Sequence, residues 1–410
     1  MTRSRALTGE SDFMKLWSAQ AVSAFGARIT REGLPMAAVL VLGASPGQIG
    51  LLAALSRGPA LVVGLMAGGF VDRSRRRGLL VAMDVVRALL LATIPVAAWL
   101  HLLSMIHLYL AAATVGAASV LFEIADHAYL PTLVATSALT DANARLSATE
   151  AVAEVGGPAM AGLLFQWLGG PYAVALNALT YLVSAGFLGA IVTREPQPAA
   201  AERPHWGRDV VDGLRAASAE KRVAPLLVMQ GSNALFGGFF SSLYILFALR
   251  VVRLDTALLG MTIAAGGVGA LAGAFIAPRL ARLAGVGPAI VVSSILAASS
   301  MFFIPLAPAD RLVGMGFLCA SQMLGDALWV TSEVLAASLR QTLLPQAILG
   351  RVAATFQAVA GGLGVVGALV SGALGGWIGP RETLMIACAG MVLGTLTTAF
   401  SALRHYGAKA

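Results

Sequence analysis

The chain has 410 residues, of which 58% are hydrophobic and 12% are charged. This composition is too apolar and too poor in charge for a soluble domain of this size. The net charge of +8 comes from basic residues dispersed at the ends of apolar runs, not gathered on one face, so we expect no nucleic-acid partner.

Apolar stretches long enough to cross a hydrocarbon core of about 30 Å recur along the whole chain. They cover residues 13–42, 47–70, 79–100, 104–130, 144–168, 171–193, 223–249, 257–279, 287–308, 311–337, 351–375 and 380–403. The first run is longer than the apolar core of a signal peptide, so we expect no cleaved leader. The pattern predicts an all-α membrane protein with twelve transmembrane helices in a lipid bilayer.

A long polar stretch over residues 194–222 separates the sixth apolar run from the seventh and contains an amphipathic segment over 206–217. We therefore expect an N-terminal six-helix bundle over 1–193, a linker over 194–222 and a C-terminal six-helix bundle over 223–410.

Lys and Arg residues predict the orientation, because short cytoplasmic loops carry an excess of them. With both termini in the cytoplasm, the basic residues left outside are Arg250, Arg253, Arg311 and Arg381. We expect a multi-pass protein of the bacterial inner membrane with both termini cytoplasmic.

The two halves repeat. At an offset of 210 residues, Gln20 aligns with Gln230 and Glu123 with Glu333, and at an offset of 206, Arg145 aligns with Arg351. A constant offset through successive helices indicates duplicated bundles, which suit a transporter because two similar bundles can rock about a site at the membrane midplane.

A basic loop follows the second apolar run. Five residues of the run 68–80 match the signature G-x-x-x-D-R-x-G-R-R of the major facilitator superfamily, and the chain resembles that family: Gly68, Asp72, Arg73, Arg76 and Arg77. The resemblance implies the major facilitator fold, two pseudo-symmetric six-helix bundles, with this loop as a gate. An acid at a helix end can engage arginines and a neighbouring helix N-terminus and so stabilise one access state.

Residues 122–131, 144–150, 338–341 and 349–352 are similar to the drug, macrolide and enterobactin exporter branch of that superfamily. In the fifth apolar run, Gly157, Pro158 and Gly162 resemble an element associated with antiporters. Both resemblances imply export.

Charged residues inside the apolar runs are candidate pathway residues, because a charge in a span costs roughly 3 kcal/mol and usually faces water or another charge. The first run carries Arg28, Arg31 and Glu32, and the spacing of Arg28 and Glu32 predicts an ion pair, with a substrate or proton site as the alternative. Gln20 and its repeat partner Gln230, with Asn233, are further pathway candidates.

Glu123 and Glu333 occupy equivalent positions in the fourth and tenth runs. A carboxylate in a low-dielectric cavity can load and release protons, so these two acids are either proton carriers or partners of loop arginines. Asp126 and Asp326 are further acids on the expected pathway.

Three other patterns concern polar residues within the spans. Asp84 and Arg87 predict an i,i+3 pair, and Asn177 predicts an interhelical hydrogen bond. Arg57 lies in the middle of the second run, where a charge needs a polar cavity. Together with Arg28 and Arg31, it suggests that the pathway tolerates anionic groups. We expect no metal site and no cofactor.

These features favour a secondary active transporter, a proton-coupled exporter of a small amphiphilic or drug-like molecule that acts by alternating access. Its expected partners are a small-molecule substrate, the proton gradient and the bilayer, and we expect a monomer. An importer or lysolipid flippase on the same scaffold, and a receptor that does not transport, remain as alternatives. A clustered catalytic set is missing from the sequence, so an enzyme is not expected.

Overall fold

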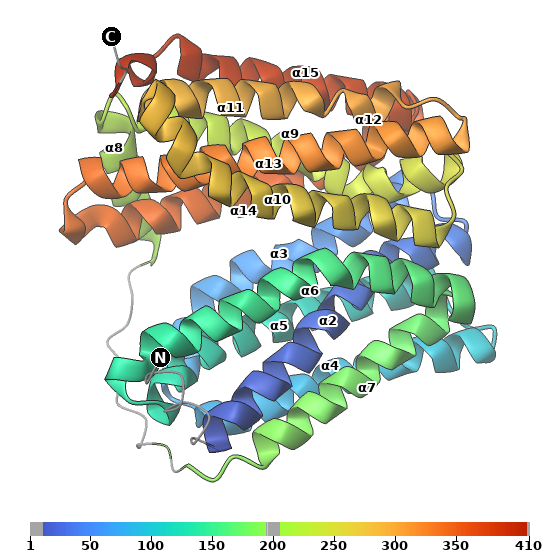
Figure 1. Ribbon diagram of the computed structural model, residues 1–410. Coiled ribbons are helices and arrows are strands. Elements are labelled where there is room, and N and C mark those ends of the chain that lie inside the picture. The colour runs from blue at the N-terminus through green and yellow to red at the C-terminus, as the bar shows by residue number, and fades with distance from the viewer. Residues whose placement is uncertain (1–10, 194, 196–205, 408–410) are drawn as a thin grey trace. The chain divides into compact units, whose positions relative to one another are not determined.

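The computed structural model describes residues 11–193, 195 and 206–407, except for the side chains of residues 64–70, 72, 206–210 and 347. Regular structure in this part of the chain consists of helices (Figure 1). The first six long helices are α2 (Ser11–Leu40), α3 (Pro46–Asp72), α4 (Arg76–Trp99), α5 (Met105–Leu133), α6 (Leu139–Leu168) and α7 (Gly170–Gly189).

A short amphipathic helix, α8 (Trp206–Ala219), follows the linker. The remaining long helices are α9 (Ala224–Arg250), α10 (Thr256–Ala284), α11 (Val286–Ser300) with the one-turn α12 (Phe303–Leu306), α13 (Arg311–Leu343), α14 (Gln346–Trp377) and α15 (Pro380–Ala399). Single 3-10 turns lie at η1 (Thr136–Ala138) and η2 (Ala402–His405).

A helix lies over each apolar range predicted from the sequence. Several helices run further than predicted, because their amphipathic ends carry polar residues that lower the mean hydropathy; α13, for example, continues to Leu343. The ninth predicted span is interrupted, since α11 ends at Ser300 and α12 begins at Phe303.

By length and composition alone, nine helices within the described residues could cross a membrane. The helices α2, α3 and α6 are not among these nine. Both α2 and α6 carry several charged residues, which lower their mean hydropathy.

The chain folds into two compact units. Unit 1 comprises Met1–Ala44 and Leu55–Pro204, and unit 2 comprises Ser45–Ala54 and His205–Ala410. The first turns of α3 therefore belong to unit 2, whereas the sequence-based boundary assigned them to the N-terminal bundle.

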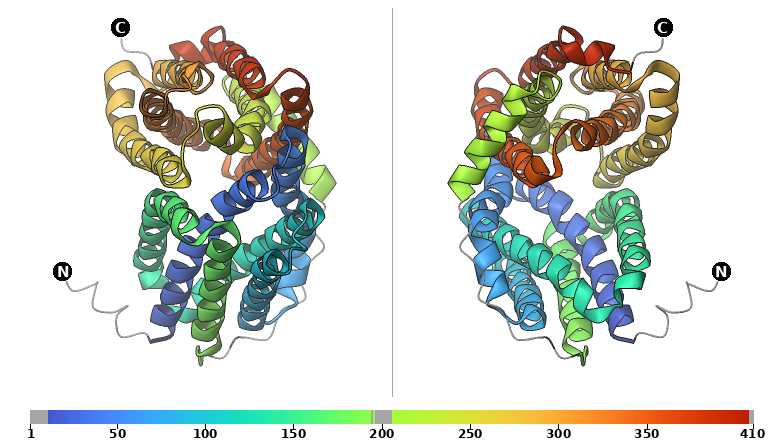
Figure 2. Two further views of the ribbon diagram at one scale, coloured as in Figure 1. Left: turned by 90° about the vertical axis from the view of Figure 1, so that its right-hand side faces the viewer. Right: turned by 90° about the vertical axis from the view of Figure 1, so that its left-hand side faces the viewer.

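In unit 1, α2 packs against α6 and α7, and α4 packs against α5 and α7 (Figure 2). Small residues permit these close approaches. At Gly26 a side chain would overlap with Asn177 and Thr180 of α7, and at Gly33 it would overlap with the Phe165 ring of α6.

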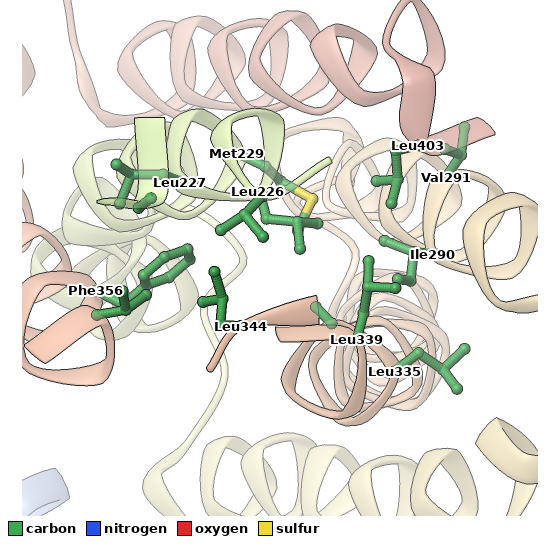
Figure 3. Packing of buried hydrophobic residues seen from close by; sticks show 14 of the residues in the cluster. Leu226, Leu227, Met229, Ile290, Val291, Leu335, Leu339, Leu344, Phe356 and Leu403 are labelled. Atoms are coloured by element: carbon green, nitrogen blue, oxygen red, sulfur yellow. The ribbon is translucent and has the colours of Figure 1, made fainter. Parts of the chain in front are cut away.

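In unit 2, α9 packs against α14 and α15, and α11 packs against α13 and α15. The buried cluster in Figure 3 joins α9, α11, α13 and α14 through residues such as Leu226, Leu339 and Phe356. The linker helix α8 packs on α14. Gly213 allows this contact, because a side chain there would overlap with the backbone of Arg351.

Candidate transport site

A stripe of polar and charged residues runs along one face of α2 in unit 1. Gln20 lies more than two turns before Arg28, Arg31 lies one turn after Arg28, and all three are within reach of α5 or α6. Trp17 joins the same region, since its Nε1 donates to Thr149 Oγ1 of α6 at 2.9 Å. The predicted pathway residues of the first helix thus face the helices that carry the unit's other acids.

Two arginines of α2 are paired with one acid of α6. Glu154 accepts from Arg28, and its Oε1 lies 2.9 Å from Arg31 Nη2. Arg31 Nε also lies 2.8 Å from Glu32 Oε1. The predicted Arg28–Glu32 pair was wrong, because the Arg28 side chain extends across α6 at Gly157 and places its guanidinium at Glu154.

These ion pairs lie in the middle of their helices and are nevertheless open. The side chain of Arg31 is 45% exposed and that of Glu154 is 41% exposed. A charge facing lipid at this depth would be costly, so open charged groups in mid-helix point to a water-filled cavity.

Proline residues shape the backbone around this cluster. Pro35, Pro59 and Pro158 lie inside α2, α3 and α6. Since proline has no N–H, the carbonyl four residues earlier lacks its helical partner, and in α2 and α6 those carbonyls belong to Arg31 and Glu154. The antiporter-like element therefore acts locally here: Gly157 makes room for Arg28, Pro158 frees a carbonyl and Gly162 is buried in the packed face.

An acidic group lies further along the stripe. Gln20 Nε2 donates to Asp126 Oδ1 of α5, and the charges of Glu123 and Glu150 lie near enough to act on Asp126. Among the described side chains, no ion pair joins Asp126 to a cation. Unit 1 therefore has an arginine-rich zone and an acid-rich zone on one stripe.

The structure describes only part of the signature loop. The side-chain positions of Gly68 and Asp72 are not among those that the structure describes, and Arg73 is exposed in the turn after α3. Arg76 Nη1 donates to the Ala128 carbonyl at 2.8 Å, and Arg77 Nε donates to the Leu188 carbonyl at 3.1 Å. Both arginines thus bind backbone oxygens of α5 and α7.

Glu195 caps the helix that follows the signature loop. Its two carboxylate oxygens accept from the backbone N–H groups of Arg76 at 2.6 Å and Arg77 at 2.7 Å. The residue at the N-cap position, Arg75, makes no side-chain hydrogen bond to the helix. A carboxylate at a helix N-terminus satisfies free N–H groups and meets the positive end of the helix dipole.

Asp12 lies beside this loop at the start of α2. Its carboxylate accepts from Lys15 Nζ at 2.7 Å, from the Val192 and Thr193 amides at 3.0 and 2.8 Å, and from Thr193 Oγ1 at 2.6 Å. Burial opposes ionisation, but these hydrogen bonds outweigh it and hold the pKa of Asp12 well below its ordinary value.

Unit 2 places its candidate residues on α9 and α13. Asn233 is 3% exposed, and neither its Oδ1 nor its Nδ2 has a hydrogen-bond partner among the described residues. Gln230 Oε1 is also unpartnered within the same part of the chain. The repeat explains the difference from Gln20, because the position equivalent to Asp126 is occupied by Ala336.

The two acids of α13 differ in their surroundings. Asp326 extends into space left by Gly266 of α10, and Glu333 lies near enough to Arg340, two turns further along α13, for their charges to interact. Since the Asn233 amide makes no side-chain hydrogen bond within the described residues, neither acid is joined to it. The polar pair of α9 and the acids of α13 therefore do not form one hydrogen-bonded group.

Other sequence-based predictions are confirmed. Asp84 and Arg87 form a buried ion pair, and the guanidinium lies 4.3 Å from the ring centroid of Phe122 and 4.2 Å from that of Tyr181. Asn177 of α7 donates to Thr30 of α2.

Sequence reasoning missed the partners that come from distant parts of the chain. Glu154 is separated from Arg31 by 123 residues, and Glu195 is separated from Arg76 by 119 residues. The sequence shows that Glu154 lies inside an apolar run and that Glu195 stands beside a proline. It does not show which residue either acid contacts.

Comparison with known proteins places this geometry in context. Residues 6–410 match the family model described as transmembrane secretion effector. The chain is 28% identical over 357 residues to the enterobactin exporter EntS of Citrobacter koseri, covering 85% of this chain and 82% of the relative.

Solved structures share the fold at low sequence identity. A mutant of the nucleoside transporter NupG superimposes with a TM-score of 0.77 at 10% identity, covering 95% of this chain and 99% of that chain. A bacterial homologue of the iron transporter ferroportin, in an inward-facing state, gives a TM-score of 0.74 at 16% identity, covering 95% and 98%.

The fold and the charged stripe define a multi-pass membrane transporter of the major facilitator type. Within that superfamily, the chain belongs to the transmembrane secretion effector family.

Proposed function

We propose that this protein is a proton-coupled exporter of a small amphiphilic molecule. It works as a monomer of twelve transmembrane helices in the bacterial inner membrane, with both termini in the cytoplasm. Export as the direction of transport is supported by the exporter relative and by the antiporter-like element of α6. The observation that carries the proposal is the mid-helix stripe of unit 1. It holds both an open arginine cluster and Asp126, which no ion pair joins to a cation among the described side chains.

Asp126 is the best candidate for the proton-carrying group. Gln20 Nε2 donates to its carboxylate, and the charges of His127, Glu123 and Glu150 act on it, so several titratable groups share one place. Glu333 is less suited, because Arg340 of the same helix is a nearby cation whose charge acts on it. Glu123 and Glu150 serve as neighbours that tune Asp126.

The stripe combines aromatic and polar side chains, as a binding site for an amphiphilic solute would. Trp17 and Phe25 are half-buried on α2 and alternate with Gln20 and Arg28. Aromatic rings provide apolar contact area while amides and guanidinium groups fix orientation, as in most small-molecule sites.

Alternating access is supported by the duplicated architecture. The packing of α2 with α6 and α7 in unit 1 corresponds to that of α9 with α14 and α15 in unit 2. Two similar bundles can rock about a central site and expose it to each side in turn.

Transport into membrane vesicles tests the proposal. Inverted and right-side-out vesicles, energised by respiration, would be given ethidium and the carboxylate probe dansylglycine, with and without a protonophore. We expect protonophore-sensitive accumulation of at least one probe in inverted vesicles. We expect Asp126→Asn to abolish the pH dependence of this uptake, whereas the neighbouring Glu123→Gln shifts it only slightly.

The other outcomes separate the alternatives. Uptake confined to right-side-out vesicles would indicate an importer. Translocation of a fluorescent lysophospholipid alone would indicate a flippase, and no uptake of any probe would favour a receptor. Uptake that is insensitive to the protonophore, or an unchanged pH profile in Asp126→Asn, would overturn proton coupling through this residue.

A further inference from the structure

Arg57 lies in the middle of α3 and has no carboxylate partner among the described side chains. It is exposed, and among the described side chains no ion pair or hydrogen bond engages its guanidinium. A cation at this depth is costly unless water or an anion meets it. The position therefore needs an explanation beyond packing.

The charges around Arg57 do not neutralise it. The groups whose charges act on it are Arg31 and Glu32 of α2. Glu32 is already paired with Arg31, whose other donor engages Glu154, and Glu154 is shared with Arg28. Three arginines thus share two carboxylates in this cluster, which leaves one positive charge in excess.

Glu150 does not supply the missing charge. It lies one turn before Glu154 on α6, and its charge acts on Arg28 and on Asp126, not on Arg57. The excess positive charge therefore remains on the α3 side of the cluster, opposite the acid-rich zone.

The space beside Arg57 is open. A side chain added at the next residue, Gly58, would meet no atom within 4 Å, and Arg31 across from it is 45% exposed. Pro59 removes the helical partner of the Leu55 carbonyl on the same turn. An exposed arginine, open space at the adjoining residue and a second exposed arginine nearby form an incomplete anion site.

We propose that Arg57, assisted by Arg31, binds an anionic oxygen group of the exported molecule, so that the substrate class is an amphiphilic organic anion. Carboxylate, phosphate and sulfonate groups match the planar fork of a guanidinium, which donates two parallel hydrogen bonds to them. This assignment rests on the proposed function and names the substrate class of the same site. Arg28 and Arg31 are paired with Glu154. The anionic group of the substrate supplies the partner of Arg57.

Binding of matched probes to the purified full-length protein in a non-ionic detergent tests the assignment. Dansylglycine carries a carboxylate, dansylglycinamide is its uncharged counterpart, and dansylethylenediamine is cationic, while all three share one fluorophore. We expect the carboxylate probe to bind at least about tenfold more tightly than the amide. Arg57→Gln should remove this preference and leave amide binding unchanged.

Two further variants keep the test decisive. Arg57→Lys keeps the charge but loses the fork, so it should retain part of the preference even where Arg57→Gln folds poorly. Arg282→Gln removes an exposed arginine at the end of α10 and should bind all three probes as the wild-type protein does. Equal binding of the carboxylate and amide probes by the wild-type protein, or an unaltered preference in both Arg57 variants, would overturn the inference.

Inorganic phosphate distinguishes the source of the anion. Phosphate alone should displace dansylglycine only weakly if the site recognises the head group of a larger molecule. Displacement at low phosphate concentration would assign the site to a free anion and overturn the substrate claim. Should ethidium accumulate in inverted vesicles while dansylglycine fails to bind, the exporter proposal stands and the anion assignment falls.

Discussion

Charged side chains in the middle of α2 and α6 pair with one another. Glu154 binds Arg28 and Arg31, and Gln20 of α2 donates to Asp126 of α5, whereas Arg57 of α3 is the residue that we propose binds the solute. The sequence predicted an ion pair between Arg28 and Glu32 from their spacing on one face of the helix. It could not predict the pairing of Arg28 with Glu154. A side chain as long as arginine reaches several acids, and tertiary packing determines which of them it pairs with.

Asp12 predicts a pH dependence of stability. Hydrogen bonds hold its pKa below the ordinary value in the folded protein, so its contribution is fully present above the unfolded-state pKa of about 3.9 and is lost as the pH falls below that value. We expect Asp12→Asn to lower the melting temperature in detergent at pH 7 and to flatten its decline between about pH 5 and pH 3.

Asp212→Asn is the matched control for this experiment, because Asp212 forms an exposed pair with Arg215 at 3.6 Å that contributes little. An acid-induced loss of stability in Asp12→Asn as steep as in the wild-type protein would show that the hydrogen bonds of Asp12 do not carry this effect.

The helices lie where the hydropathy of the sequence predicts them, with two exceptions. Interruption of the ninth span at Met301 and Phe302 leaves no signal in a continuously apolar run. The first turns of α3 belong to unit 2 because glycines allow them to lie directly on α14, a tertiary contact that composition does not encode.

This helix contact can be tested with a glycine pair on α14. A Cβ atom at Gly372 would lie 3.0 Å from the Cα atom of Gly50 and 3.2 Å from that of Gly47 in α3. Backbone atoms this close cannot move aside without a cost in packing. Gly376, one turn later, has nothing within 4 Å. We expect Gly372→Leu to lower the melting temperature in detergent by several degrees and to reduce transport, and Gly376→Leu to do neither.

Equal behaviour of the two leucine variants would mean that the close packing of α3 on α14 does not stabilise the fold. A loss of transport in Gly372→Leu without any loss of stability would instead indicate that the contact must separate and re-form during transport.

At the scale of the molecule, the class of protein followed from composition, the internal repeat and the signature loop. The repeat anticipated that helix pairs packed in one unit would recur in the other, as α2 with α7 and α9 with α15 do. It did not anticipate their chemical divergence. Asp126 has no acidic counterpart in the second half, where Ala336 stands, so the proposed proton site belongs to one unit only.

The account depends on water reaching the stripe of α2, and the reactivity of introduced cysteines measures this directly. The two native cysteines, Cys319 and Cys388, would first be replaced by serine. Ala27→Cys places a thiol on the stripe between Gln20 and Arg31. Leu89→Cys places one on α4 at a position that is 62% exposed and that we expect to face lipid.

A charged methanethiosulfonate reagent reacts with thiolate in water and not with a thiol in hydrocarbon. We predict that the cysteine at position 27 reacts at least about tenfold faster than the cysteine at position 89 in membranes treated from both sides. Reaction at position 27 that is no faster than at position 89 would contradict a hydrated pathway through unit 1.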